Sequence, residues 1–125
     1  DAYQIRLTVD MTKENTWRLS NGKNEYLEFY VNPGARMIVA KRNGSTGLSS
    51  FSASFSLPAL RMPVEGKEDV IELDIYVDRS SVEFFTADGT SAMTMIVFPE
   101  EIYDSIESTS GEINGKVRSL ARIWK

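Results

Sequence analysis

The sequence predicts an all-β fold: one domain over residues 1–125, built as a two-sheet antiparallel β-sandwich of the jelly-roll or concanavalin-like type. Apolar and polar residues alternate with a period of two in several short runs, and turn-forming dipeptides separate these runs. No run keeps an apolar stripe of helical period for three turns. A closed barrel is the alternative arrangement of such strands.

The alternation is strictest in residues 3–9, 51–57 and 71–77. Because successive side chains of a strand point to opposite faces of a sheet, each run predicts a strand with one buried and one wetter side. Strand-forming residues also dominate residues 25–32, 35–42, 82–87, 91–98 and 116–124. We expect about nine short strands in all, with Trp17 and Trp124 packed in the core.

Turn-forming residues lie between the runs, at Asn21-Gly22, Pro33-Gly34, Asn43-Gly44, Asp88-Gly89 and Asn114-Gly115. Asp88-Gly89 predicts a two-residue hairpin between residues 82–87 and 90–98. Residues 78–81 predict a type I turn in which the side chain of Asp78 accepts backbone N–H groups. We expect residues 60–69 to form the longest loop, because this segment holds proline, glycine and mixed charge.

The composition excludes several kinds of chemistry. The chain has 125 residues with 14 basic and 18 acidic side chains, so it lacks the basic surface of a nucleic-acid binder. It has no Cys and no His, which excludes thiol nucleophiles, disulfides, Ser-His-Asp triads and thiolate or imidazole metal sites. No segment matches a calcium loop, and the longest apolar runs are far shorter than the roughly 20 residues of a membrane span. We expect no cofactor, no metal, no nucleic-acid partner and no membrane span.

Residues 71–99 carry a more specific signal. The segment reads Ile-Glu-Leu-Asp-Ile-Tyr-Val-Asp-Arg-Ser-Ser-Val-Glu-Phe-Phe from residue 71, then Asp88-Gly89, then Met-Thr-Met-Ile-Val-Phe-Pro up to residue 99. It resembles the C-terminal β-sandwich of glycosyl hydrolase family 32, the β-fructosidases that include invertase, levanase and inulinase. Residues 35–47, 51–55 and 121–124 are similar to further strands of that module, and residues 1–33 match it in character only. Phe84 departs from the pattern, since a smaller aliphatic residue is more usual there.

The resemblance implies a non-catalytic role for this chain. In the family, an N-terminal five-bladed propeller of the same polypeptide hydrolyses fructosyl linkages in sucrose, levan or inulin by a retaining mechanism, with an Asp nucleophile and a Glu acid/base. The catalytic markers Asn-Asp-Pro-Asn-Gly, Arg-Asp-Pro and Glu-Cys are missing, because the sequence has no Asp-Pro dipeptide and no Cys. The chain begins at Asp1 rather than Met, which we interpret as an excised C-terminal module of a larger, secreted or periplasmic enzyme.

Two interpretations of this module follow. The first is a domain that packs on the propeller and stabilises it, with homo-oligomers as a further expectation. The alternative is a carbohydrate-binding module for fructan or a sucrose-type sugar.

The candidate binding or domain-interface residues are Tyr76, Phe85, Tyr30, Arg79 and Glu83. The three rings share the phase of charged residues, so they are expected on the outer faces of the sheets. Outward rings stack against sugars, anchor a protein interface, or cover neighbouring strands. Arg79 is expected to pair with Glu83 or to reach a neighbouring domain.

A small enzyme that uses a carboxylate pair is the third hypothesis. Glu72, Asp74 and Asp78 lie on one phase of a predicted strand, opposite Glu83 on the next. Retaining glycosidases use two carboxyls about 5–5.5 Å apart. We interpret these acids as solvated positions on a strand whose other phase is apolar, and we assign no catalytic residue.

Overall fold

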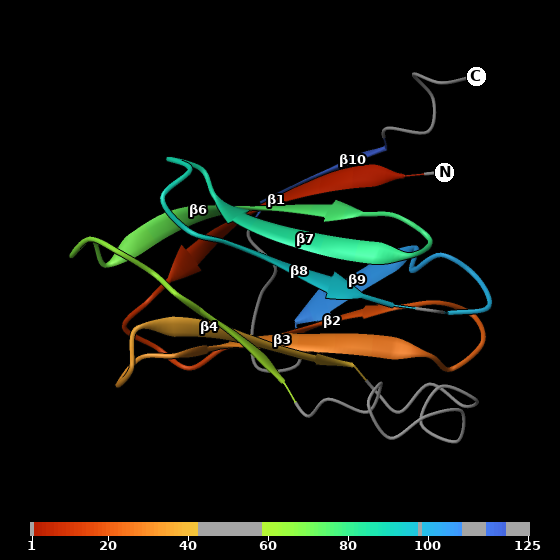
Figure 1. Ribbon diagram of the computed structural model, residues 1–125, viewed down its shortest axis with the longest axis horizontal. Helices are drawn as coiled ribbons and strands as arrows, with labels where there is room; N and C mark the ends of the chain where they lie inside the picture. Colours follow the sequence, from red (N-terminus) through yellow and green to blue (C-terminus); the bar gives the residue numbers. More distant parts are fainter. Residues whose placement is uncertain (1, 43–58, 98, 109–114, 120–125) are drawn as a thin grey trace.

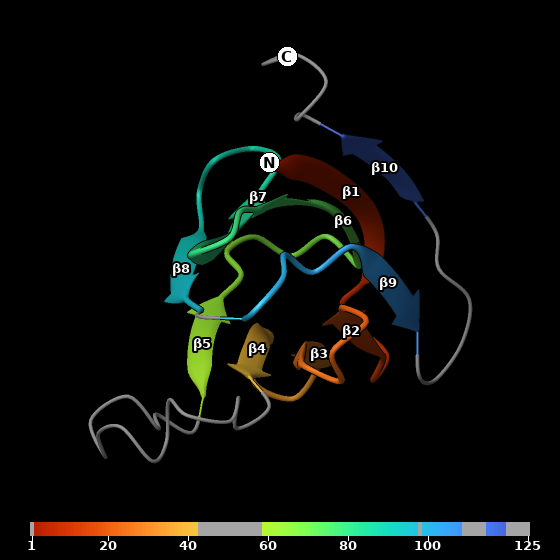
Figure 2. The same cartoon turned by 90° about the vertical axis from the view of Figure 1, so that its right-hand side faces the viewer.

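The computed structural model describes residues 2–42, 59–97, 99–108 and 115–119. These residues form two five-stranded antiparallel sheets packed face to face, which confirms the two-sheet sandwich (Figure 1). Sheet A runs in the order β10 (Gly115–Ser119), β1 (Tyr3–Asp10), β6 (Val70–Val77), β7 (Ser81–Thr86) and β8 (Ala92–Ile96). Sheet B runs in the order β5 (Leu60–Pro63), β4 (Met37–Arg42), β3 (Tyr26–Asn32), β2 (Thr16–Ser20) and β9 (Ser105–Ser108). Figure 2 shows the layers end on, with β8 near β5 on one side and β10 near β9 on the other.

Three observed strands, β2, β5 and β9, were not predicted. β5 occupies the start of the segment expected to be the longest loop, so that expectation was wrong for residues 60–63. The strand pairs with β4 at the edge of sheet B and ends at Pro63. Proline is tolerated in an edge strand, because its missing N–H costs no hydrogen bond in the interior of the sheet. The predicted strand at residues 51–57 lies outside the described residues, as do residues 120–124 of the last predicted strand.

The pairing of β1 with β6 is the longest ladder of the described residues, and it runs over all eight positions of each strand. It aligns the apolar phases of the two strands, so that their inward side chains share one layer. Ile5, Leu7, Val9, Leu73 and Ile75 are fully buried there. Full burial of a side chain of this size contributes roughly 1.5–3 kcal/mol to the stability of the fold.

Three aromatic rings join the sheets through the middle of the sandwich. Trp17 of β2 stacks on Phe29 of β3, with ring centroids 5.2 Å apart and planes 16° apart. Phe29 then meets Phe84 of β7 edge to face, at 5.2 Å and 64°. Phe29 and Phe84 are fully buried and Trp17 nearly so, which confirms the core position expected for Trp17. Trp124 lies outside the described residues.

The hairpin between β7 and β8 is longer than predicted. The backbone N–H of Thr86 donates to the carbonyl of Ser91 at 3.0 Å, so four residues, and not two, form the connection. Within it, the Asp88 carboxylate accepts the N–H of Thr90 at 3.0 Å, and Gly89 adopts a φ of +77°. The left-handed conformation that favours glycine is therefore needed at Gly89 alone in this loop.

No helix that could cross a membrane occurs among the described segments of the chain.

Replacing Phe84 by Ala is expected to lower the free energy of unfolding by about 3–5 kcal/mol, because it removes the ring of sheet A that meets Phe29. Urea denaturation followed by far-ultraviolet circular dichroism measures this loss. Phe85→Ala is the matched control, since the neighbouring ring points to the opposite face and is half-exposed. Equal losses in the two variants would contradict the assignment of Phe84 to the joint between the sheets.

Tyr103 is expected to make the fold sensitive to alkali. Its side chain is 1% exposed, and burial raises its pKa to about 12. The unfolded chain releases the same proton near pH 10. The contribution of Tyr103 to the free energy of unfolding is therefore complete below pH 10 and falls as the pH rises toward 12. In Tyr103→Phe, the loss of unfolding free energy at high pH should be smaller by on the order of 2 kcal/mol. Urea midpoints measured from pH 9 to 12 test the effect.

Candidate functional site

The outer face of sheet A brings two rings and two carboxylates together on β6 and β7. The register pairs Asp74 with Phe85 and Tyr76 with Glu83, so these four outward positions form a square. Tyr76 and Phe85 occupy one diagonal and meet edge to face, with centroids 5.5 Å apart and planes 81° apart. The two carboxylates occupy the other diagonal, with the touching rings between them.

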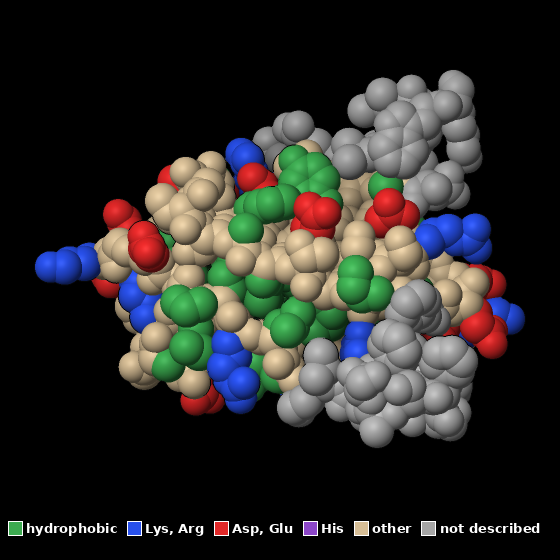
Figure 3. Space-filling model, in the orientation of Figure 1, with side chains coloured by type: hydrophobic (Ala, Val, Ile, Leu, Met, Phe, Trp, Pro, Cys, Tyr) green, Lys and Arg blue, Asp and Glu red, His purple; other side chains and the backbone are tan. Residues whose placement is uncertain are grey.

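A recess of about 390 Å³ lies over this square. Its lining is completed by residues at the end of β7 and in the following loop, namely Thr86, Ala87 and Gly89. Tyr76 is 38% exposed, whereas Phe85 is partly covered. We refer to this site as the sheet A recess. Figure 3, which views the edge formed by β8 and β5, shows acidic and apolar side chains side by side along the sheet A side of the molecule.

An arginine from β1 neutralises one of the two carboxylates. Arg6 donates from Nε to Asp74 Oδ1 at 2.6 Å and from Nη2 to Asp74 Oδ2 at 2.9 Å. The hydrogen bond with Asp74 is the main cause of the raised pKa of Arg6. Asp74 is only 8% exposed, so the expectation of a solvated position was wrong for this residue. A bidentate pair offsets the cost of burying the carboxylate.

The second carboxylate is open to a ligand. Within the described part of the chain, neither the Glu83 carboxylate nor the Tyr76 hydroxyl has a hydrogen bond or an ion pair. The pairing of Arg79 with Glu83 that was one expectation is therefore absent between these described residues. Glu83 thus retains its acceptor capacity and Tyr76 retains a donor.

Arg79 lies at the corner between β6 and β7, outside the sheet A recess. The N–H of Asp78 donates to the carbonyl of Ser81 at 2.9 Å. The Asp78 carboxylate accepts the N–H of Arg79, which confirms its expected role as an acceptor for one backbone N–H. The Arg79 side chain is exposed. Since Val77 pairs with Tyr3, this corner lies at the end of the sandwich where β1 begins.

Tyr30 is separated from the other candidates, because it projects from the outer face of sheet B. The Lys41 ammonium lies 5.8 Å from the centre of the Tyr30 ring. A similar contact covers Tyr26, whose ring centre is 3.9 Å from the guanidinium carbon of Arg18. Cations thus cover these outward rings of sheet B, while the rings of sheet A contact each other.

This arrangement favours binding over acid–base chemistry. Glycosidases place two carboxyls on either side of the bond that breaks. Here the rings separate Asp74 from Glu83, Arg6 engages Asp74, and Thr8 donates to Glu72 at 2.8 Å. Among the described residues, no group of three or more acidic side chains could hold a metal ion.

The sequence predicted the candidates on β6 and β7, whereas Arg6 and the loop residues of the sheet A recess were not predicted. The β6–β7 positions follow from alternation around a short turn. Arg6 comes 68 residues before Asp74, and no local pattern shows that β1 pairs with β6.

Comparisons with known proteins agree with this fold. Residues 1–125 match the family described as Glycosyl hydrolases family 32 C terminal. The chain is 27% identical over 134 residues to a levanase of Bacillus subtilis (strain 168), covering 99% of the chain and 20% of the levanase. It is 29% identical over 135 residues to a levanase of Bacillus sp. (strain L7), covering 99% of the chain and 14% of that protein.

Two solved structures share the architecture. The exo-inulinase of Aspergillus awamori matches with a TM-score of 0.71 and 25% identity over 94% of the chain and 24% of the inulinase. The fructofuranosidase of Schwanniomyces occidentalis matches with a TM-score of 0.56 and 12% identity over 94% of the chain and 26% of that enzyme, which shows the fold alone. The chain spans about a fifth of the length of the first levanase. It belongs to the C-terminal β-sandwich family of the family 32 glycosyl hydrolases.

Proposed function

We propose that this chain is the non-catalytic C-terminal domain of a β-fructosidase-type glycoside hydrolase, and that it packs on the catalytic domain and stabilises it. The observation that carries the proposal is the family match over the whole chain, combined with coverage of 14–24% of the levanases and the exo-inulinase. Most of such an enzyme lies outside this domain. The separation of Asp74 from Glu83 by two rings supports chemistry in another part of the polypeptide.

The family resemblance supports the finer parts of the proposal. The catalytic domain would be an N-terminal five-bladed propeller that hydrolyses fructosyl linkages in sucrose, levan or inulin by a retaining mechanism. A secreted or periplasmic location follows from the same resemblance, because levan and inulin are polymers encountered outside the cell.

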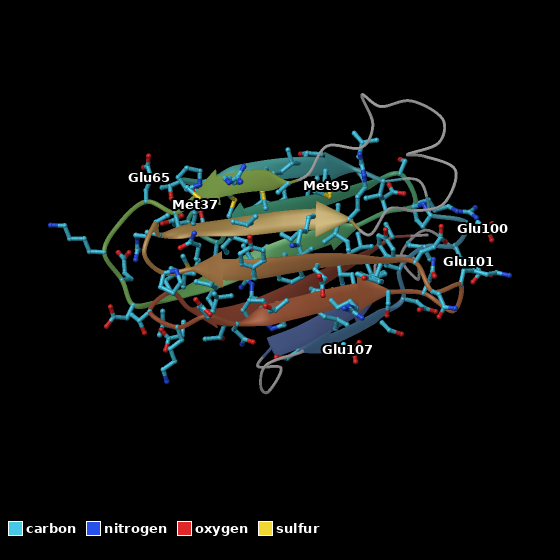
Figure 4. The ribbon with its side chains drawn as sticks, turned by 90° about the horizontal axis from the view of Figure 1, so that it is seen from below. Met37, Glu65, Met95, Glu100, Glu101 and Glu107 are labelled. Carbon is cyan, nitrogen blue, oxygen red and sulfur yellow. The ribbon has the colours of Figure 1, made fainter. Side chains whose placement is uncertain are left out.

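The docking surface that we propose is the end of the sandwich around Arg79. In a C-terminal domain the rest of the polypeptide precedes β1, and β1 begins beside this corner because Tyr3 pairs with Val77. Exposed Glu100 and Glu101 lie at the same end (Figure 4). An interface between domains typically buries about 600–1,500 Å², and exposed charges at its rim set its orientation.

Hydrogen bonds tie residues at this end to both sheets. The Glu25 carboxylate is 6% exposed and accepts the N–H of Glu100 at 2.8 Å and the Asn21 amide at 3.1 Å. The Tyr3 hydroxyl donates to the carbonyl of Tyr103. These bonds anchor Glu100 and Tyr103 to the two sheets, which supports a docking surface that is ordered before contact.

Mixing this chain with the separately expressed catalytic domain of the same gene tests the proposal. We expect a stable complex by size-exclusion chromatography, and fructose release by the catalytic domain but not by this chain. Arg79→Glu should weaken association about tenfold, since it reverses a charge at the proposed interface. Arg61→Glu, on the exposed edge strand β5, is the matched control.

Two outcomes would contradict the proposal. The first is failure of the wild-type chain to bind the catalytic domain. The second is fructose release by this chain alone that disappears in Glu83→Gln.

A further inference from the structure

The sheet A recess combines an apolar floor with polar corners. Its volume of about 390 Å³ lies in the range of roughly 300–1,000 Å³ that is typical of small-molecule sites. Tyr76 and Phe85 form the floor, and their edge-to-face contact leaves a ring surface open to solvent. Because each ring holds the other, little side-chain entropy is lost when a ligand covers them.

The polar groups around this floor match a ligand rich in hydroxyl groups. The Glu83 carboxylate accepts hydrogen bonds and has no partner among the described residues, while the Tyr76 hydroxyl is free to donate or accept. Arg6 uses two of its N–H groups on Asp74, and its side chain is 52% exposed, so further donors face solvent. Donors and acceptors on both sides of an apolar patch are what adjacent sugar hydroxyls require, because each hydroxyl both donates and accepts.

The location of the recess keeps it apart from the proposed docking surface. Its lining ends with Thr86, Ala87 and Gly89, beside the β7–β8 loop, whereas Arg79 lies at the other end of β7. A catalytic domain held at the Arg79 corner would leave the recess open. On the outer face of sheet B, by contrast, cations lie against the rings of Tyr26 and Tyr30.

We propose that the sheet A recess is an accessory binding site for an oligosaccharide, with Tyr76 and Phe85 as the platform and Glu83 as the hydrogen-bond acceptor. The identity of the sugar, a fructosyl chain, rests on the proposed function, whereas the existence of the site rests on the recess itself. Asp74 is a positioning residue that holds Arg6 over the sheet. Because the recess is open, we expect weak binding, with a dissociation constant of about 1 mM for short oligosaccharides.

Affinity electrophoresis of the 125-residue chain through gels that contain levan, inulin or dextran tests this site. We expect retardation by levan or inulin, and little by dextran. Tyr76→Ala and Phe85→Ala should each weaken retardation at least fivefold, and Glu83→Gln about threefold, because its amide keeps only part of the acceptor capacity. Tyr30→Ala is the matched control, since it removes an outward ring from sheet B and should leave retardation unchanged.

A circular dichroism melting curve of each variant checks that every variant run on the gels is folded. Titration of short fructo-oligosaccharides, followed by amide chemical shifts, should move the signals of residues 83–89 before those of β3. Equal loss of retardation in Tyr30→Ala and Phe85→Ala would overturn the proposal, and so would the absence of retardation in all three gels.

The glycan-binding and docking experiments test the sheet A recess and the proposed function independently. A chain that binds its catalytic domain but no glycan refutes the recess and leaves the docking role intact. A chain that binds levan or inulin but no catalytic domain supports the recess and refutes docking. Retardation by dextran alone would refute the fructosyl assignment.

Discussion

The register of the β6–β7 hairpin controls both the interior of the sandwich and the outer face of sheet A. Alternate positions bury Ile75 and Phe84 and display Tyr76 and Glu83, so a slip of one residue would exchange the two sets. The corner at Asp78 fixes this register, because a two-residue connection allows only one alignment. The joint between the sheets and the sheet A recess therefore depend on one constraint.

The two faces of the hairpin use aromatic residues in different ways. On the inner face, Phe84 extends a line of rings from sheet B and fixes how the two layers pack. On the outer face, Tyr76 and Phe85 contact each other edge to face, with acidic groups around them. Adjacent residues of β7 thus serve the core and the surface, which explains why Phe84 and Phe85 look alike in the sequence but differ in burial.

The sequence predicted the fold class and the placement of Tyr76, Glu83 and Phe85 on two neighbouring strands, because both depend on local patterns. Strict alternation marks β1 and β6, and a short turn joins β6 to β7. β9 and β5 escaped prediction because four residues are too few to reveal a period, and β2 because only two apolar residues, Trp17 and Leu19, mark its inward phase. The bond between Arg6 and Asp74 could not be predicted, since it depends on which distant strands become neighbours.

The pairing of β1 with β6 has a consequence for synthesis on the ribosome. Strands β2, β3 and β4 follow one another along the chain and pair in that order, so this meander is complete by residue 42. β1 emerges first, yet its ladder partner on one side ends at residue 77 and on the other at residue 119. β1 therefore has no ladder partner until β6 has been synthesised, and an unpaired strand with an apolar face is prone to aggregation in a partly folded chain.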